Sequence, residues 1–205
     1  MDNIIVTSGG FNTINNYVSE DNIKMFERVS KGKKVLVIAN AAPKYSGNYI
    51  ARENVKNNFL NVGAVLVDII DLDKDNLDII LDYDIVYGLG GNLTHLIELN
   101  QKTNFKNMLL KFLDKGIYIG ESAGSMILSD DVKYIYDLKK GMKPKYDIVL
   151  DSYEGLGLIN TYIYPHYQKA NEDMQMKIDH FESDNGITIT KMNDGDIITY
   201  NYNSN

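Results

Sequence analysis

The chain has 205 residues, of which 44% are hydrophobic and 24% are charged, a composition typical of a globular protein with its own core. Its formal net charge is −7 and its acidic residues are scattered, which argues against nucleic acid or a membrane surface as a main partner. The absence of cysteine excludes disulfides and a thiol nucleophile.

No linker, repeat or low-complexity run divides the sequence, so we predict one domain over residues 1–205. Residues 4–6 are typical of a first strand, and they are not preceded by the basic start of a signal peptide. No apolar run approaches the ~18 residues needed to cross a bilayer. A cytoplasmic location is therefore expected, with no membrane partner.

Short apolar runs then alternate with stretches of helical spacing. Further strands are predicted at residues 34–40, 64–70, 84–88 and 117–120, and helices at residues 52–60, 93–100 and 104–115. Because these strands show no polar alternation, we expect both of their faces to be covered. The pattern predicts an α/β fold with a single doubly wound, mostly parallel sheet. Later strands are predicted, less regularly, at residues 161–164, 187–190 and 197–200.

A glycine-rich segment, residues 88–92, follows one predicted strand and precedes a helix. Its backbone can approach a ligand closely, and the N–H groups of Gly90 and Gly91 could form an oxyanion hole together with that of Ala123. Asn92 completes this candidate substrate-binding loop. A phosphate-binding loop is a weaker interpretation because the lysine and hydroxyl residues of a P-loop are missing. A purely structural turn is a third interpretation.

Residues 120–124, Gly-Glu-Ser-Ala-Gly, match the G-x-S-x-G pattern. A buried strand leads into the pattern and a helix-compatible stretch follows it, which is the context in which a nucleophilic serine lies on a strained turn. We therefore expect an outlying backbone conformation at Ser122. The alternative is that Ser122 only caps a helix. Both this turn and the glycine-rich segment are expected at the carboxyl edge of the sheet, where ligand sites of α/β proteins form.

A serine nucleophile requires a general base, and the chain has three histidines. His95 lies in a predicted helix and His180 in a charged stretch, where solvated or locally bonded histidines are common. His166 follows a predicted strand and a proline, at the carboxyl end of that strand. It is the best candidate base, and we expect it within hydrogen-bonding distance of the Ser122 hydroxyl.

Two aspartates are candidates for the carboxylate that orients the imidazole. Asp194 lies in an Asp-Gly turn between late strands, where it can reach the carboxyl edge, although Asp-Gly is also a common hairpin turn. Asp137 lies between Ser122 and His166 in an irregular stretch. We favour Asp194. No histidine pair has metal-ligand spacing and the carboxylates are dispersed, so neither a metal nor a cofactor is expected.

Three blocks carry a resemblance to a known family: residues 87–92, 120–125 and 164–167. In this order they resemble the peptidase E (aspartyl dipeptidase, S51) family, which includes cyanophycinases. The resemblance implies a three-layer, flavodoxin-like fold similar to class I glutamine amidotransferases, with serine in place of the cysteine nucleophile. The family's serine corresponds to Ser122 and its histidine to His166, while its acid corresponds to Asp194 or Asp137.

The sequence departs from the family pattern at a few positions. Leu93 replaces the threonine after the glycine-loop asparagine, and Asp194 stands where the family has glutamate. No clear counterpart is found for the cationic residue that would hold an acidic substrate side chain.

The resulting hypothesis is a serine peptidase that hydrolyses small peptides, dipeptidase-like, with N-terminal aspartate as a candidate preference. A homodimer is considered possible. The alternatives are an esterase of α/β-hydrolase type and a non-catalytic ligand-binding relic of the fold.

Overall fold

The computed structural model describes residues 2–11, 20–41, 49–139 and 148–202. Its strands are β1 (Ile4–Thr7), β2 (Lys34–Ile38), β3 (Leu66–Ile70), β4 (Ile85–Gly88), β5 (Ile117–Glu121), β6 (Tyr162–Tyr164), β7 (Ile189–Lys191) and β8 (Ile197–Tyr200). Its helices are α1 (Glu20–Ser30), α2 (Tyr49–Asn61), α3 (Leu93–Lys102), α4 (Phe105–Leu113), α5 (Ala123–Met126), α6 (Lys133–Leu138) and α7 (Glu172–Asn185). Two 3₁₀ turns are η2 (Leu77–Asp82) and η4 (Tyr167–Lys169).

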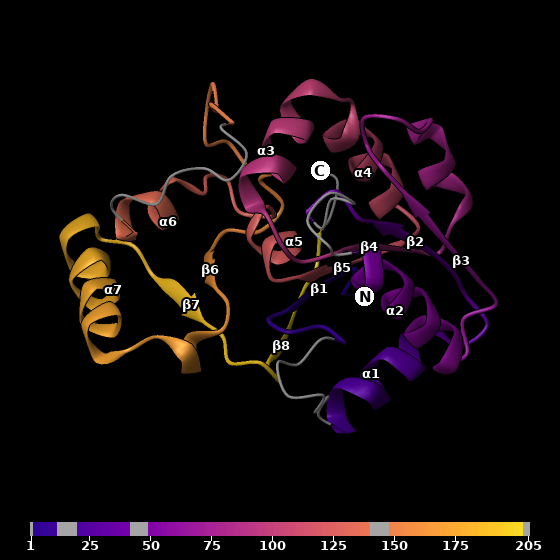
Figure 1. Ribbon diagram of the computed structural model, residues 1–205, viewed down its shortest axis with the longest axis horizontal. Coiled ribbons are helices and arrows are strands. Elements are labelled where there is room, and N and C mark those ends of the chain that lie inside the picture. Colours follow the sequence, from indigo (N-terminus) through magenta and orange to yellow (C-terminus); the bar gives the residue numbers. More distant parts are fainter. Residues whose placement is uncertain (1, 12–19, 42–48, 140–147, 203–205) are drawn as a thin grey trace.

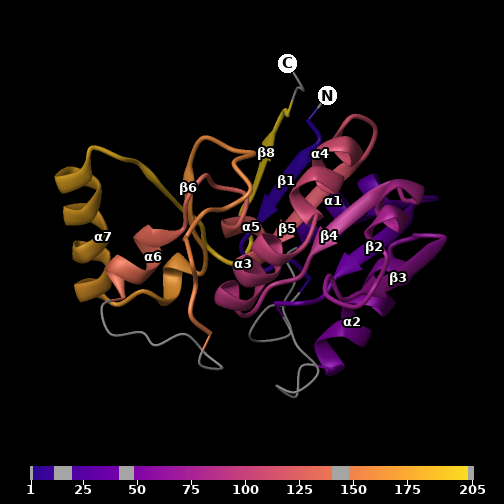
Figure 2. The same ribbon diagram turned by 90° about the horizontal axis from the view of Figure 1, so that it is seen from above.

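The central sheet has six strands in the order β3-β2-β4-β5-β1-β8. Its first five strands run parallel to their neighbours, and β8 pairs antiparallel with β1 at one edge. Helices α1 and α2 cover one face, and α3, α4 and α5 cover the other (Figures 1 and 2). The predicted fold class, a mostly parallel, doubly wound α/β sandwich, is therefore confirmed.

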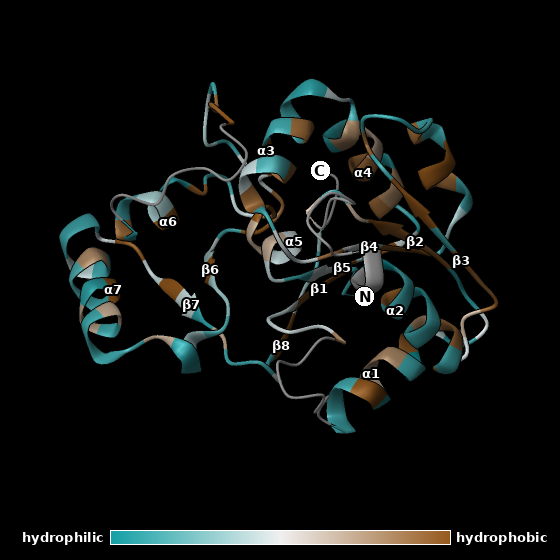
Figure 3. Cartoon of the chain, in the orientation of Figure 1, coloured by the Kyte–Doolittle hydropathy of each residue, from teal (hydrophilic) through white to brown (hydrophobic). Residues whose placement is uncertain are grey.

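Two apolar layers hold the helices to the sheet. Figure 3 shows the hydrophobic residues concentrated in the strands and on the inward sides of the helices. One layer contains a cluster of stacked and edge-on rings, namely Phe11, Phe26, Phe59 and Tyr87. Burial of such rings is a main source of stability in a domain of this size.

In the described part of the chain, no helix has the length and apolar character required to cross a membrane.

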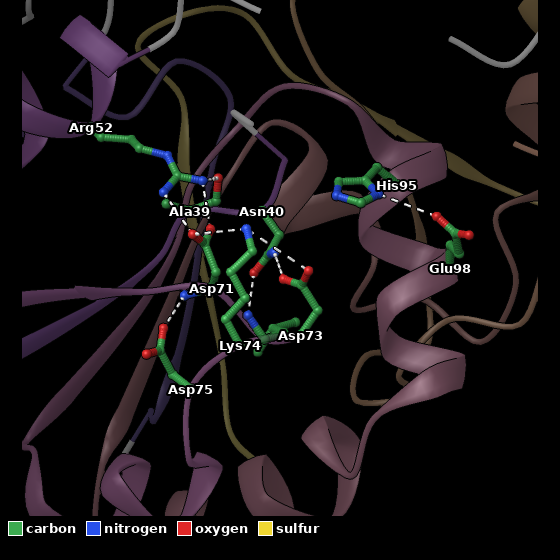
Figure 4. A network of polar contacts seen from close by, with 10 residues as sticks. Ala39, Asn40, Arg52, Asp71, Asp73, Lys74, Asp75, His95 and Glu98 are labelled. Carbon is green, nitrogen blue, oxygen red and sulfur yellow. Dashed lines mark hydrogen bonds and ion pairs between the residues drawn. The ribbon is translucent and has the colours of Figure 1, made fainter. Parts of the chain in front are cut away.

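A polar network fixes the carboxyl ends of β2 and β3 (Figure 4). Arg52 of α2 donates to both oxygens of Asp71, at 2.6 and 3.2 Å, and to the Ala39 carbonyl at 3.0 Å. Asn40 accepts a hydrogen bond from the Leu72 N–H at 2.7 Å. Because the paired charges are almost fully buried, removing one partner would leave the other uncompensated. The network therefore ties α2 to this edge of the sheet.

The second half of the chain differs from the single sheet that the sequence predicts. β6 and β7 pair parallel with each other in a separate two-stranded sheet, and only β8 joins the central one. In Figures 1 and 2 this small sheet lies with α6 and α7 at one side of the molecule. Ile163 and Ile189 are buried in the apolar layer of α3–α5, so β6 and β7 extend that layer rather than the sheet. Helices α1, α6 and α7 have no counterpart among the predicted elements.

Candidate active site

Ser122 lies between β5 and α5 in a conformation that non-glycine residues rarely adopt. Its φ is 48° and its ψ is −107°, as expected for a strained turn. The Ser122 N–H donates to the Thr7 carbonyl at 3.1 Å, and its own carbonyl accepts from Ser125 and Met126 at 2.9 Å. The Ser122 side chain makes no capping hydrogen bond to the helix. Helix capping alone therefore does not account for the serine, whose hydroxyl points to other partners.

The glycines beside Ser122 allow α5 to pack directly on the sheet. A Cβ atom on Gly120 would lie 2.6 Å from the Gly124 carbonyl oxygen. One on Gly124 would lie 2.0 Å from the Gly88 carbonyl oxygen, well inside van der Waals contact. A side chain at either position would move the turn, so the spacing of the motif follows from close backbone packing.

The glycine-rich segment lies directly against Ser122. A Cβ atom on Gly90 would lie 3.1 Å from the Ser122 Cβ, and Gly91 has a φ of 139°. Asn92 begins α3, where its Oδ1 accepts from the His95 N–H at 3.4 Å. The N–H groups of Gly91 and Ala123 donate to no protein acceptor within the described ranges. The two loops thus lie side by side next to the hydroxyl.

His166 brings an imidazole to the serine from β6. Its Nε2 lies 3.1 Å from the Ser122 Oγ, as expected, and its Nδ1 is hydrogen-bonded to Asp194 Oδ1. Because an ionised carboxylate only accepts hydrogen bonds, Nδ1 carries a proton, and in the neutral ring Nε2 faces the hydroxyl with its lone pair. His166 has a left-handed backbone (φ 59°, ψ 33°), and its N–H donates to Ser8 Oγ at 2.7 Å.

Asp194 reaches the imidazole from the turn between β7 and β8. Its backbone N–H donates to Gln168 Oε1 at 3.1 Å, and its Oδ1 accepts from the Ser8 hydroxyl at 3.4 Å. Lys169 Nζ lies 2.5 Å from its Oδ2. Burial opposes ionisation of this carboxyl, but the hydrogen bonds from Lys169 and His166 outweigh burial and lower the pKa of Asp194 below its usual value. Asp194 is therefore ionised at neutral pH.

The other predicted candidates lie elsewhere. Asp137 is exposed on α6 and makes no contact with the His166 ring among the described residues. His95 Nδ1 lies 3.2 Å from Glu98 on α3, and His180 is exposed on α7. Within the described residues, no group of three or more His, Asp or Glu side chains is arranged to hold a metal ion. The geometry thus pairs His166 with Asp194 rather than with Asp137.

A cavity of about 600 Å³ opens beside Ser122 and His166. Apolar and aromatic side chains in its wall include Leu93, Met126, Ile135, Tyr136, Tyr164 and Met174. Lys139 and Lys169 also line it, and no carboxylate does so in the described part of the chain. Burial lowers the pKa of the Lys139 ammonium, which lies 5.7 Å above the Tyr164 ring. Two ammonium groups and several apolar side chains thus surround the space beside the Ser122 hydroxyl.

Sequence reasoning missed both lysines and Ser8. Lys169 stands three residues after His166, a spacing that a 3₁₀ turn places on one side, so a signal for it existed. No comparable signal connects Ser8 or Lys139 with the site, because tertiary packing alone brings them there.

Comparison with known proteins places the chain among peptidases. Residues 4–204 match the profile of peptidase family S51. An uncharacterized peptidase of Listeria monocytogenes is 28% identical over 150 residues, 71% of each chain. An uncharacterized peptidase of Pasteurella multocida is 31% identical over 121 residues, 56% of each chain, so that alignment spans about half of the relative.

Solved structures share the fold. A crystal structure of a candidate peptidase E protein from L. monocytogenes superimposes with a TM-score of 0.70 at 22% identity, covering 99% of this chain and all of the other. A peptidase from an acI-B1 Actinobacterium superimposes with a TM-score of 0.67 at 14% identity, covering 97% of this chain and 82% of the other. At these identities the likeness concerns the fold.

Proposed function

The chain belongs to peptidase family S51, and we propose that it is a serine peptidase that uses Ser122 as nucleophile, His166 as general base and Asp194 as the orienting carboxylate. One observation carries this proposal: the continuous contact from Ser122 Oγ through both nitrogens of His166 to Asp194. Asp137, the other candidate acid, has no comparable contact with the ring in the described residues.

The proposed reaction follows from the direction of these hydrogen bonds. Ser122 Oγ attacks the peptide carbonyl carbon while its proton moves to His166 Nε2. The N–H groups of Ala123 and Gly91, with Gly90 beside them, stabilise the oxyanion. The C–N bond then breaks as Nε2 returns the proton to the leaving amine. Water, deprotonated by the same nitrogen, hydrolyses the acyl-enzyme and restores the serine.

The substrate we propose is a small peptide with an acidic residue before the scissile bond, N-terminal aspartate being the simplest case. The cavity supports this specificity because two lysines and no carboxylate are among its described lining residues. Lys169 is occupied by Asp194, whereas Lys139 lies over the Tyr164 ring. The ammonium of Lys139 is therefore the group proposed to bind a substrate carboxylate.

The first test is removal of the nucleophile. Ser122→Ala should lower kcat by roughly 10⁴-fold or more while the folded state is retained, because no other hydroxyl lies on the strained turn. A fluorophosphonate probe should label the wild type and a Ser152→Ala control but not Ser122→Ala. A folded Ser122→Ala protein with more than a tenth of wild-type turnover would contradict the proposal. An unlabelled wild type would favour the non-catalytic alternative.

The second test concerns the substrate. On a panel of dipeptides and isoaspartyl peptides, those with acidic acyl residues should have the highest kcat/KM. Lys139→Met should lower the preference for Asp over Asn by about tenfold, since a hydrogen bond to a charged group is worth one to a few kcal/mol. Lys177→Met, at an exposed position on α7, is the control. Hydrolysis of simple esters without any peptide cleavage would instead indicate an esterase.

A further inference from the structure

Lys169 contacts both the proposed base and its carboxylate. Its Nζ lies 2.5 Å from Asp194 Oδ2 and 3.3 Å from His166 Nδ1. The lysine is held there locally, because η4 begins directly after His166 and the Lys169 N–H donates to the His166 carbonyl at 2.9 Å. Residues three apart lie on the same side of a 3₁₀ turn. The ammonium is thus fixed beside the ring.

The contact between Lys169 and the imidazole is not an attractive hydrogen bond. His166 Nδ1 carries a proton that it donates to Asp194, and an ammonium can only donate. Two donors therefore face each other at 3.3 Å. The contact is tolerable while the ring is neutral and becomes a repulsion between like charges when the ring is protonated.

The carboxylate between them is shared. Asp194 Oδ1 accepts from His166 and from the Ser8 hydroxyl, and Oδ2 pairs with Lys169. Part of the negative charge that would stabilise an imidazolium is therefore neutralised by the lysine. The lowered pKa of Asp194 agrees with this arrangement.

We propose that Lys169 is a positioning residue that keeps the His166 imidazole neutral, and hence able to accept the serine proton, at lower pH than the histidine–aspartate pair would allow by itself. This inference rests on the proposed function of the site. Lys169 would not touch the reacting atoms, and it would act through the charge of the imidazole and of Asp194. Its effect would therefore appear in the pH dependence of the reaction.

Other charged and titratable groups around the ring do not produce the same effect. Of the described residues, Lys139, Tyr136 and Tyr164 line the cavity that the ring faces. Burial raises the pKa values of both tyrosines, which therefore stay neutral when the ring titrates. Lys139 is also positive, but its ammonium lies over the Tyr164 ring, 5.7 Å from the ring centre, rather than against Asp194. Lys169 alone among these groups contacts the histidine–aspartate pair.

The experiment measures kcat/KM from pH 5 to 9 for the wild type, Lys169→Met, Lys169→Arg and the control Lys177→Met. Lys169→Met should move the acidic limb to higher pH by about one unit, because a neighbouring positive charge shifts a titration by this order. Its rate at the alkaline plateau should stay within about tenfold of wild type. Lys169→Arg keeps the positive charge, so its acidic limb should lie at the wild-type pH. The acidic limb of Lys177→Met should also be unchanged.

A second readout does not require activity. The ring C–H signals of the three histidines can be titrated by NMR and assigned with His95→Gln and His180→Gln. The His166 midpoint should rise in Lys169→Met by the same shift as the acidic limb. This measurement separates the two proposals, since it would succeed even if the protein hydrolysed no peptide.

Three results would overturn the inference. A uniform loss of kcat/KM at every pH with an unmoved His166 midpoint would show a structural role. A higher KM without a shift of the limb would show a substrate contact instead. If Lys169→Met does not fold, Lys169→Gln serves in its place, and an unshifted midpoint in that variant would be equally decisive.

Discussion

The two halves of the proposed site are built differently. Ser122 and the glycine-rich segment follow neighbouring, buried strands of the six-stranded sheet. His166 and Asp194 come from the region of β6 and β7, strands of three residues in a two-stranded sheet. Helix α7 beside them buries one described side chain completely, Ile178. Ser122, the proposed nucleophile, is thus held by the central sheet, whereas His166, the proposed base, lies on an extension of the apolar core beyond that sheet.

The difference teaches how each kind of group is held. A strained backbone at Ser122 persists only where dense packing leaves no alternative, and the contacts among Gly88, Gly120 and Gly124 provide that packing. His166 also has a positive φ, 59°, but its ring is oriented by hydrogen bonds, from Nδ1 to Asp194 and between Nε2 and the Ser122 hydroxyl. Ser8, just after β1, links the two regions because it accepts from the His166 N–H and donates to Asp194.

The largest effect within this comparison should come from the two candidate acids. Asp194→Ala removes the acceptor that holds the His166 tautomer and should lower kcat by roughly 10²–10⁴-fold. Asp137→Ala, at an exposed position, should be nearly normal. Steady-state kinetics of both variants, with circular dichroism as a check on folding, decides between them. A large loss of kcat in Asp137→Ala together with a wild-type kcat in Asp194→Ala would reverse the assignment. A wild-type kcat in both variants would remove the carboxylate from the proposed mechanism.

The same contrast explains how far the sequence could predict the molecule. The central strands are continuous apolar runs, a pattern that requires cover on both faces, and glycines mark the places where the backbone turns sharply. The fold class and the surroundings of Ser122 therefore follow from local residues. The antiparallel position of β8 and the separate pairing of β6 with β7 do not, because the partner and direction of a strand depend on contacts that are distant in the chain.

The partners of His166 also depended on contacts that are distant in the chain. Asp194 comes beside the imidazole because the Tyr167 N–H donates to the Met192 carbonyl and the Met192 N–H donates to the Tyr164 carbonyl, both at 2.9 Å. This register between β6 and β7 is a tertiary property. Sequence reasoning could therefore name both aspartates and favour Asp194 from its place in a turn after a late strand, but it could not derive the contact with the ring.

A smaller effect should come from loosening the base region alone. Ile178→Ala leaves a cavity under α7 and should lower the free energy of unfolding by about 2–5 kcal/mol. Met176→Ala on the same helix, where the side chain is 56% exposed, should change it little. Amide hydrogen exchange should show faster opening of β6 and β7 in Ile178→Ala than of β4 and β5. Equal acceleration in both sheets would mean that the two regions unfold as one unit.

The smallest expected change in stability concerns the nucleophile region. Gly124→Ala adds a methyl group that would lie 2.0 Å from the Gly88 carbonyl oxygen, a backbone atom with little freedom to move. Alanine is the better helix former by about 1 kcal/mol, which offsets part of the clash. We expect a net loss of about 1–3 kcal/mol, measured by urea unfolding.

Activity should fall further than this loss of stability suggests. The clash moves α5 away from β4, and with it the Ala123 N–H and the Ser122 hydroxyl, so kcat should decrease by about 10²-fold even where the variant is fully folded. Ile178→Ala provides the comparison. Its free energy of unfolding should fall more than that of Gly124→Ala, whereas its kcat, measured at a temperature where both variants are folded, should fall less. If Gly124→Ala kept wild-type kcat, the close packing of the glycines would serve the fold alone. Rigid placement of Ser122 would then not distinguish this region from the region that holds His166.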